Sequence, residues 1–592
     1  MTEFEGEIPI HDVVIIGAGP CGLAIAARLR EPTPSALFTE SEHQKFHFIK
    51  ARQNHKPDSK AKNKPIRTSR RAHTSPDRLL PGHSISNHDL DITVLDANGD
   101  QWMSAWNEKF EDLGITHLRS PMFFHPDPRD RDGMLEFAVR EGRQEELKEI
   151  SGVVGKELSK HQRKKRLRDG NKWLQETTYV DERYRHDYFR PSQALFKDYC
   201  DSIVKRYDLA KLVQKSDVSS ITYSAPSSLF TLQTSTGVKK ARIVVLAIGA
   251  AAKPSLPPDC PFCNIPPNDS IRHIFSKTQV PEPIPNMNTN TTATPRISTT
   301  IFPPALLSKA SNPHSFPTSL AIIGGGLTSA QIARLASVIN IPVTHLILRR
   351  PLKTKHFDVD LCWLAKFKNH SMSAFWKADS DEERADMMRE ARGGGSVNPE
   401  YGRILRGLKE EGRVTLWEWT EVAGAKEKDS RDGEPERWSL ELQGKGGRRD
   451  EIVVDHVVYA TGIAADINRV EAVKPLLDDF PIETVGGMPC LTKELMWNED
   501  IPFFVTGRLG GLRLGPAAPN LEGARLGAEF IAGKIASLMS GLDRSVPDDM
   551  SEVDMRRLGL GRQNQFDVLD PDGAESDRDS GTVQQELCSN LC

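Results

Sequence analysis

The sequence has no apolar run long enough to cross a membrane, and residues 1–7 are acidic where a secretory signal peptide would be basic and then apolar. It also has no excess charge of either sign, because 78 Lys and Arg face 81 Asp and Glu, for a net charge of -3. The chain therefore has no overall electrostatic field that would attract nucleic acid or an anionic membrane. We expect a soluble, cytoplasmic protein that binds neither nucleic acid nor membrane.

Cysteine is scarce, with 8 residues in a chain of 592, so a disulfide framework is not expected. Only Cys260 and Cys263, in the run Cys-Pro-Phe-Cys, have the spacing of a redox pair. Cys588 and Cys592 do not form a prenylation box, because that motif needs its cysteine fourth from the end.

Apolar residues make up only 38% of the chain, which is low for a wholly folded protein, and three segments have few of them. Residues 50–90 are basic and are expected to form a solvated surface insertion, with a nucleic-acid or localisation signal as the open alternative. Residues 251–317 are rich in Pro, Thr and Ser and are expected to form a linker or insertion. Residues 546–592 are acidic and are expected to be a disordered tail.

The strongest positive signal is a glycine-rich turn near the N-terminus. Four apolar residues, 13–16, lead into Gly17, Gly19 and Gly22 in the spacing G-x-G-x-x-G, and an alanine-rich helix follows. This pattern predicts a strand, a tight turn that leaves room for a pyrophosphate, and a helix whose N-terminal N–H groups face the anion. Residues 35–39 are expected to form the next strand and to end at Glu40, where a carboxylate accepts from a ribose hydroxyl.

The same pattern recurs after residue 318. Gly324, Gly326 and Ser329 take the three small-residue positions, and the following strand, 343–348, ends in Arg349 and Arg350. Guanidinium groups bind a 2'-phosphate that a carboxylate would repel, so this second site is expected to prefer NADPH to NADH. A pair of surface arginines is the alternative.

Each glycine loop is followed later by a strand that runs into Ala-x-Gly, at 247–249 and at 460–462. A further strand is expected at 502–507. We therefore predict an α/β fold with two doubly wound, Rossmann-like nucleotide-binding domains, the second inserted in the first. The expected limits are 1–250 and 451–545 for the two parts of the first domain, 251–317 for the linker, 318–450 for the second domain and 546–592 for the tail.

Three other segments carry local signals. A helix is expected over 136–167, and another after Ser192, which is a suitable N-cap. Residues 102–126 combine aromatic, Arg and His residues suited to lining a flat ligand, although an ordinary loop packed by its own aromatics has the same composition. Gly507 and the run 514–531, with Asn520 and Leu521, predict a loop that feeds a helix N-terminus.

The order of these motifs resembles the two-dinucleotide-binding flavoproteins. Within them, the Thr328-Ser329 pair, the run 455–462 and the run 188–192 before a helix most resemble the class B flavin monooxygenases, especially the lysine and ornithine N-monooxygenases and the flavin-containing monooxygenases. The resemblance implies FAD at the first loop and NADPH at the second. It also implies that a flavin hydroperoxide delivers one atom of molecular oxygen to a small nucleophilic substrate.

Site residues follow from that resemblance. The expected cofactor-binding residues are those of the two glycine loops, together with Glu40, Arg349, Arg350, Gly507, Asn520, Leu521 and Trp102. Arg119, Ser120 and His125 are the expected catalytic residues. Segments 102–135, 355–400 and 486–515 are expected to shape the substrate pocket.

Two alternatives and two questions stay open. A disulfide reductase would use Cys260 and Cys263, and a non-catalytic regulator would keep only the flavoprotein fold. His273 lies in a run similar to the monooxygenase fingerprint, but the preceding F-x-G is missing, so a Baeyer-Villiger enzyme is not predicted. Neither the substrate nor a homo-oligomeric state is fixed by these motifs.

Overall fold

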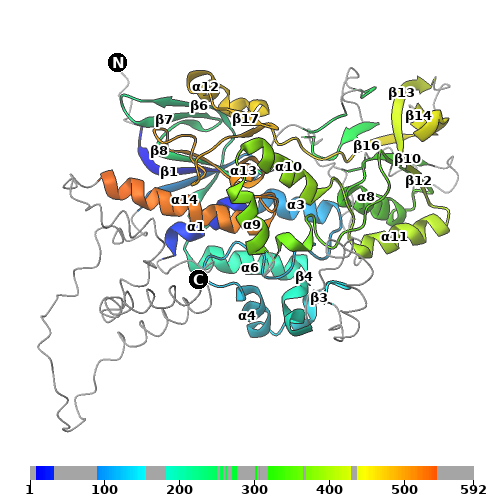
Figure 1. The fold of residues 1–592 in the computed structure, drawn as a ribbon, viewed down its shortest axis with the longest axis horizontal. Helices are drawn as coiled ribbons and strands as arrows, with labels where there is room; N and C mark the ends of the chain where they lie inside the picture. Colours follow the sequence, from blue (N-terminus) through cyan, green and yellow to red (C-terminus); the bar gives the residue numbers. More distant parts are fainter. Residues whose placement is uncertain are drawn as a thin grey trace, which may run out of the picture.

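The computed structural model describes residues 8–31, 90–154, 182–249, 254–257, 260–262, 270–276, 301–302, 306, 318–364, 368–428 and 437–542. Glu40, Cys263, the expected tail, the expected basic insertion except Leu90 and most of the expected linker lie outside these residues. The described chain forms two large sheets with helices packed beside them, a three-stranded sheet and two short strand pairs (Figure 1). Within the described residues, no helix is both long and apolar enough to span a bilayer.

The first sheet has the strand order β5-β2-β1-β8-β7-β6, with β19 paired to β8. Its central strands run parallel, and β6, β7 and β8 form an antiparallel meander. Because β19 returns to this sheet after the second unit, the predicted insertion of one unit in the other is confirmed. The strands are β1 (Ile10–Ile16), β2 (Ile92–Asp96), β5 (Val213–Lys215), β6 (Val218–Ser224), β7 (Leu229–Thr234), β8 (Gly237–Leu246) and β19 (Phe503–Val505).

Two helices pack side by side against this sheet, α1 (Pro20–Arg30) and α14 (Leu521–Leu542) (Figure 1). The small side chains of α1, such as Ala24 and Ala27, are fully buried and allow a close approach. The predicted N-cap is confirmed, because Ser192 Oγ accepts from the backbone N–H of Leu195 at the start of α6 (Gln193–Arg206).

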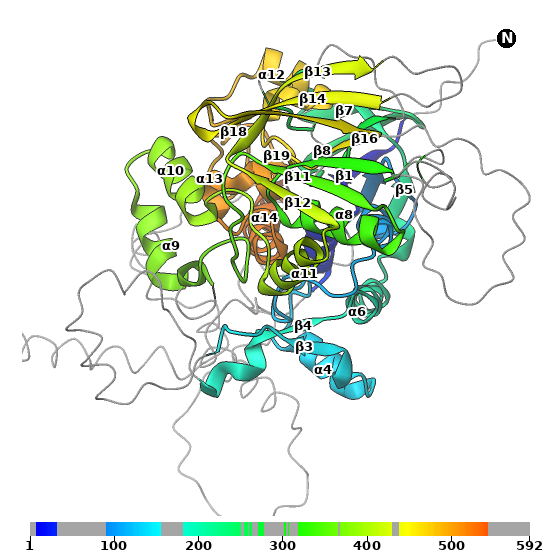
Figure 2. The same ribbon diagram turned by 90° about the vertical axis from the view of Figure 1, so that its right-hand side faces the viewer.

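The second sheet is parallel throughout, in the order β12-β11-β10-β16-β9. A separate antiparallel sheet of β13, β14 and β15 packs against one face of it, where Leu440 and Val454 share a hydrophobic cluster with Ala321 (Figure 2). The strands are β9 (Ile271–His273), β10 (Ser319–Ile323), β11 (Val343–Leu348), β12 (Val414–Glu418), β13 (Thr420–Lys428), β14 (Arg437–Gly444), β15 (Arg449–Val454) and β16 (His456–Tyr459). Helices α8 (Leu327–Val338) and α11 (Pro399–Glu410) share the hydrophobic core of this sheet, whereas α9 (Lys368–Lys377) and α10 (Asp381–Arg392) contribute their buried residues to the core of the first unit.

Two expectations need correction. Two domain limits are wrong: residue 450 falls inside β15, and the second sheet continues to Tyr459 because β16 pairs with β10. At the other limit, β9 lies within the expected linker 251–317 but pairs with β16 in the second sheet. The remaining domain limits stay predictions. Of the helix expected over 136–167, the described residues 136–154 contain only the end of α4 (Gly133–Arg140), since Gly142 turns the chain with a φ of 66°; residues 155–167 lie outside the described part. The chain then forms β3 (Leu147–Glu149), paired with β4 (Phe189–Pro191).

The remaining helices and short strands lie on connections. They are α3 (Ser104–Asp112), α12 (Lys474–Asp479), α13 (Gly511–Leu514), β17 (Thr484–Val485) and β18 (Met488–Pro489).

Candidate functional site

The first glycine loop joins β1 to α1 at the carboxyl edge of the first sheet. Gly17 has a φ of 112°, and a Cβ there would lie 2.5 Å from the carbonyl oxygen of Ala247. A Cβ at Gly22 would lie 2.0 Å from the carbonyl oxygen of Gly17, so the helix can approach the loop only with glycine at this position. Gly19 faces open space. Backbone atoms are therefore closely packed around Gly17 and Gly22, whereas the space beside Gly19 is open to an anion that approaches the helix N-terminus.

Asp96 ends the strand beside this loop. β1 has β2 on one side and β8 on the other, so its neighbour is 92–96 and not the expected strand 35–39. Asp96 Oδ2 accepts from the N–H of Ala18 at 2.8 Å, and Oδ1 accepts from the N–H of Asn98 at 2.8 Å. Asp96 therefore takes the position predicted for Glu40. A prediction based on sequence spacing from the glycine loop missed Asp96, because a long segment separates α1 from β2. The local signal, an acid directly after an apolar strand, was present in the sequence.

Unpartnered polar atoms lie where α14 begins. Asn520 Oδ1 caps the helix by accepting from the N–H groups of Glu522, at 3.0 Å, and Gly523, at 3.2 Å, while Leu521 is buried. Asn520 Nδ2 and Thr506 Oγ1 are buried and have no hydrogen-bond partner among the described residues. Gly507, with a φ of 67°, follows Thr506, and a Cβ there would lie 3.4 Å from Cys21 Sγ on α1. Buried polar atoms without a hydrogen-bond partner are expected where a polar ligand completes the site.

The second glycine loop repeats this geometry between β10 and α8. Gly324 has a φ of 141°, and a Cβ there would lie 2.5 Å from the carbonyl oxygen of Ala460. Gly326 faces open space, and Thr328 is half-buried in the first turn of α8. Ser329 Oγ is buried with no partner among the described residues.

Arg349 and Arg350 follow β11 at the carboxyl edge of the second sheet, and both are exposed. The side chain of Arg349 is 70% exposed, and it lies 3.9 Å from the carboxylate of Glu421. An exposed ion pair at that distance holds a side chain weakly. Both guanidinium groups are therefore able to turn toward an anion.

Arg119 donates to a backbone segment of the second unit instead of facing a ligand. Its Nε donates to the carbonyl oxygen of His356 at 3.2 Å, and its Nη1 to that of Ser396 at 3.3 Å. Its Nη2 donates to the carbonyl oxygens of Lys355, at 2.9 Å, and Phe357, at 2.6 Å. Burial lowers the pKa of Arg119 to about 10, which leaves it charged at neutral pH. Arg119 therefore holds this backbone segment of the second unit against the first unit. Its neighbour Ser120 is half-buried and makes none of these hydrogen bonds.

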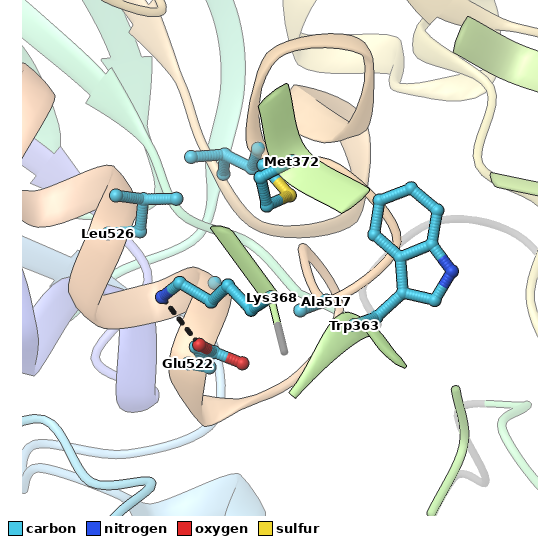
Figure 3. A pocket seen from close by; sticks show the side chains of 8 residues that line it. Trp363, Lys368, Met372, Ala517, Glu522 and Leu526 are labelled. Atoms are coloured by element: carbon cyan, nitrogen blue, oxygen red, sulfur yellow. Dashed lines mark hydrogen bonds and ion pairs between the residues drawn. The ribbon is translucent and has the colours of Figure 1, made fainter. Parts of the chain in front are cut away.

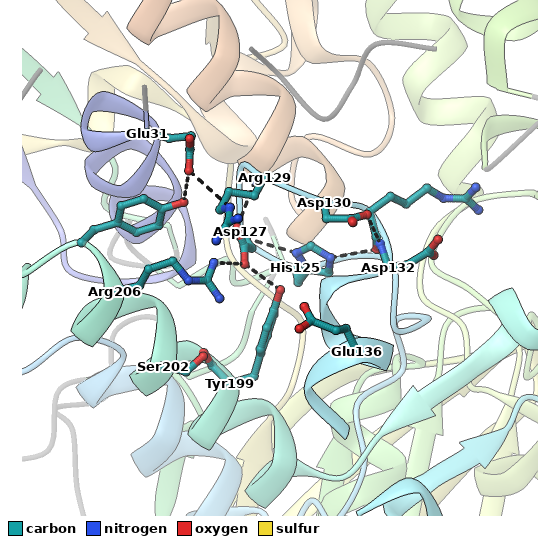
Figure 4. Close-up of polar contacts among 12 residues, drawn as sticks. Glu31, His125, Asp127, Arg129, Asp130, Asp132, Glu136, Tyr199, Ser202 and Arg206 are labelled. Atoms are coloured by element: carbon teal, nitrogen blue, oxygen red, sulfur yellow. Dashed lines mark hydrogen bonds and ion pairs between the residues drawn. The ribbon is translucent and has the colours of Figure 1, made fainter. Parts of the chain in front are cut away.

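His125 is fully buried (Figure 4). Its Nδ1 accepts from the N–H of Asp127 at 3.2 Å, so Nε2 carries the proton and donates to the carbonyl oxygen of Arg131 at 2.9 Å. Burial lowers the pKa of His125 to about 4, which keeps the ring neutral. Both ring nitrogens are used in holding the loop, so the geometry gives His125 a structural role in place of the expected catalytic one.

A buried polar network that the sequence did not reveal surrounds His125 (Figure 4). Asp127 Oδ2 accepts from Tyr199 Oη at 2.9 Å and from Arg206 Nη1 at 2.5 Å, and both donors lie on α6. Tyr207 Oη donates to Glu31 Oε2 at 2.6 Å, just after α1. These contacts anchor the loop after Arg119 to α6, and Arg129, whose Nε lies 3.7 Å from Glu31 Oε2, ties it to the end of α1.

Trp102 packs in the core of the first unit, with 6% of its surface exposed. Its Nε1 donates to the carbonyl oxygen of Leu209 at 2.9 Å. Because the indole N–H of Trp102 is hydrogen-bonded and its ring is buried, Trp102 supports the fold and has no free ring face for contact with a flavin.

A hollow of about 280 Å³, counting space open to solvent, lies at the start of α14 (Figure 3). Lys368 Nζ lies 2.7 Å from Glu522 Oε1, and Glu522 Oε2 is buried with no partner among the described residues. The walls are largely apolar: Trp363, Met372, Leu514, Ala517, Gly523 and Leu526. The hollow therefore combines apolar walls with one carboxylate oxygen that is free to accept.

Cys260 lies in the hydrophobic cluster of the second unit, where 8% of it is exposed. Its Sγ donates to Tyr459 Oη at 3.2 Å. A catalytic disulfide needs an accessible sulfur, and this thiol is packed among Phe262, Trp438 and Tyr459. Across the described ranges, no group of three or more His, Cys, Asp or Glu side chains is placed to hold a metal ion.

Fold and site together define an α/β protein with two Rossmann-like units, one inserted in the other. No protein-family model matches the sequence, and no curated protein matches it. Solved structures do share the fold. The reduced ornithine hydroxylase of Pseudomonas aeruginosa has 14% identity and a TM-score of 0.55, over 90% of this chain and 100% of that one.

Two further enzymes match to a similar extent. The ornithine N-hydroxylase of Kutzneria sp. 744, in complex with reduced FAD, NADP+ and L-ornithine, has 15% identity and a TM-score of 0.55, over 90% of this chain and 100% of that one. The FAD-bound cadaverine monooxygenase of Erwinia amylovora has 14% identity and a TM-score of 0.53, over 92% and 98%. The predicted fold class is thereby confirmed.

Proposed function

We propose that this protein is an FAD-dependent, NADPH-consuming monooxygenase that adds one oxygen atom to an amine nitrogen or another heteroatom of a small substrate. One observation carries the proposal. Two glycine loops stand at the carboxyl edges of two parallel sheets, in a fold shared over about nine-tenths of the chain with N-hydroxylating flavoenzymes.

The first loop is the proposed FAD site. The N-terminal N–H groups of α1 would face the pyrophosphate, and Asp96 lies where a carboxylate meets the adenosine ribose. Thr506 Oγ1 and Asn520 Nδ2 are available for the polar edge of the flavin. Bound FAD would supply the oxygen-transfer chemistry, and these residues would bind it and fix its orientation.

The second loop is the proposed NADPH site, and bound NADPH would supply the reducing hydride. The N-terminus of α8 and Ser329 Oγ would meet the pyrophosphate. Arg349 and Arg350 would hold the 2'-phosphate by charge-assisted hydrogen bonds.

The hollow at the start of α14 is the proposed substrate pocket. Residues from the expected segments 355–400 and 486–515 line it. The names of the matched enzymes specify ornithine and cadaverine, and each of these molecules carries an amine. The free Glu522 Oε2 would accept from a cationic amine, while the apolar walls would take an alkyl chain.

Purified protein tests this proposal directly. We expect bound yellow flavin and NADPH oxidation that needs oxygen and increases with an alkyl diamine or a basic amino acid. Turnover only with a disulfide acceptor, abolished by Cys260→Ser, would instead identify a reductase. A protein that binds no flavin would be a regulator with a flavoprotein fold.

Within an active enzyme, Glu522→Gln separates the substrate pocket from the cofactor sites. This variant should keep its flavin and its affinity for NADP+ while the KM for the amine increases. Lys534→Gln is the matched control, because Lys534 forms its ion pair with Glu499 elsewhere on the surface.

A further inference from the structure

A short backbone unit of the second domain, formed by residues 353–357 and 393–398, connects the two units; we call it the strap. The N–H of Val397 donates to the carbonyl oxygen of Lys353 at 2.9 Å, and the N–H of Lys355 donates to that of Val397 at 2.9 Å. Lys355 Nζ also donates to the carbonyl oxygens of Ala391 and Arg392, at 3.0 and 3.2 Å. The two segments therefore behave as one piece.

One end of the strap lies against the second glycine loop. A Cβ at Gly395 would lie 3.0 Å from the carbonyl carbon and oxygen of Gly325 and from the nitrogen of Gly326. Gly393 and Gly394 turn the chain here, with φ values of 62° and 85°. Lys353 Nζ lies over this turn, because a Cβ at Gly393 would lie 2.4 Å from it. Glycine backbone thus packs against the loop that leads to the buried, unpartnered Ser329 Oγ, and the Lys353 ammonium lies beside the turn at Gly393.

The other side of the strap is tied to the first unit. Arg119 holds it by the fan of hydrogen bonds to residues 355–357 and to Ser396, whose Oγ accepts from Nη2 at 3.0 Å. Arg392, at the end of α10, adds a second tie, because its Nη1 donates to the carbonyl oxygen of Pro516 at 3.1 Å and lies 3.0 Å from Asp358. Pro516 belongs to the loop that leads into α14.

We propose that the strap is the outer wall of the pyrophosphate site on the second loop, and that Arg119 is the positioning residue that fixes this wall to the first unit. The proposal rests on the assignment of NADPH to the second loop. Backbone N–H groups and Lys353 on one side, with the N-terminus of α8 on the other, would enclose the two phosphates. Since Arg119 contacts only protein, it acts on the ligand through the strap.

The test compares Arg119→Lys with Arg334→Lys. Arg334 also crosses between the units, since its Nη1 donates to the carbonyl oxygen of Gly114 at 3.4 Å, but it does not contact the strap. Both variants keep the charge and lose the planar guanidinium. Calorimetry on FAD-loaded protein measures the Kd of NADP+ and of adenosine 2'-phosphate, which has no pyrophosphate. Gly395→Ala is the second variant, because its methyl group would push the strap off the loop.

We expect Arg119→Lys and Gly395→Ala to raise the Kd of NADP+ by about tenfold, the loss expected when charged hydrogen bonds that order a site are removed. The Kd of adenosine 2'-phosphate, the flavin content and the Arg334→Lys control should stay within about twofold of wild type. Unchanged NADP+ affinity in both variants would overturn the proposal, as would parallel loss of both ligands and of flavin. Wild-type protein that binds FAD but not NADP+ would overturn the proposed function itself.

Discussion

Arg28 Nε donates to Glu529 Oε2 at 2.7 Å and so joins α1 to α14, although the two residues lie 501 positions apart in the chain. The pair brings together the helix that starts the first unit and the helix that closes it. Because the second unit is inserted between them, this contact joins the two separate parts of the chain that build the first unit.

Breaking that pair should destabilise the first unit. Arg28→Ala leaves Glu529 with 11% of its side chain exposed and without its partner, so we expect a loss of about 3 kcal/mol in the free energy of unfolding. Thermal and denaturant unfolding measure it. Arg140→Ala is the control: its partner Glu136 is 69% exposed, and the loss should be below about 1 kcal/mol. Equal losses in the two variants would contradict a special role for the helix contact.

Asp96 should be needed for FAD binding. Asp96→Ala removes the acceptor of the Ala18 N–H and the carboxylate proposed for the ribose, so protein purified from this variant should retain much less flavin. The flavin absorbance per protein measures this. Asp91→Ala is the control at an exposed position before the same strand, and its flavin content should match wild type.

The two arginines after β11 should set the choice of nicotinamide cofactor. Replacing Arg349 and Arg350 with alanine should raise the Kd of NADPH by about tenfold or more, since each lost charged hydrogen bond is worth about 1.5–3 kcal/mol. NADH has no 2'-phosphate, so its Kd should change little. Arg389→Ala removes an exposed arginine of α10 and should alter neither value. Equal changes for both cofactors would refute the 2'-phosphate assignment.

His125 should make stability depend on pH. Its pKa is about 4 in the folded chain and 6.5 for a histidine side chain in water, so the unfolded state binds more protons between these values. Stability should therefore fall as the pH drops from about 6.5 to 4, by up to about 3 kcal/mol from this residue. His125→Asn should flatten that slope, while His370→Asn, at an exposed position, should not. Burial also lowers the pKa of His273 to about 4, so the difference between variant and wild type is the quantity to measure.

The parts of this protein that depend on local chemistry could be predicted from the amino-acid sequence. Gly17 and Gly324 need positive φ values at the ends of buried strands, and the residues that follow form helices whose small side chains pack closely. Such patterns are complete within about twenty residues. They predicted both loops, the closing strands and the insertion of one unit in the other.

Features that depend on residues far apart in the chain became clear only from the tertiary structure. Asp96 replaced Glu40 as the acid beside the first loop because sheet pairing, and not sequence distance, sets the neighbour of β1. Arg119 and His125 have the composition of a catalytic site, but a guanidinium or an imidazole can equally satisfy buried backbone carbonyls. Which of the two it does depends on where distant segments lie: Arg119 meets residues 355–357, and His125 is enclosed by Tyr199 and Arg131. No local pattern records such contacts.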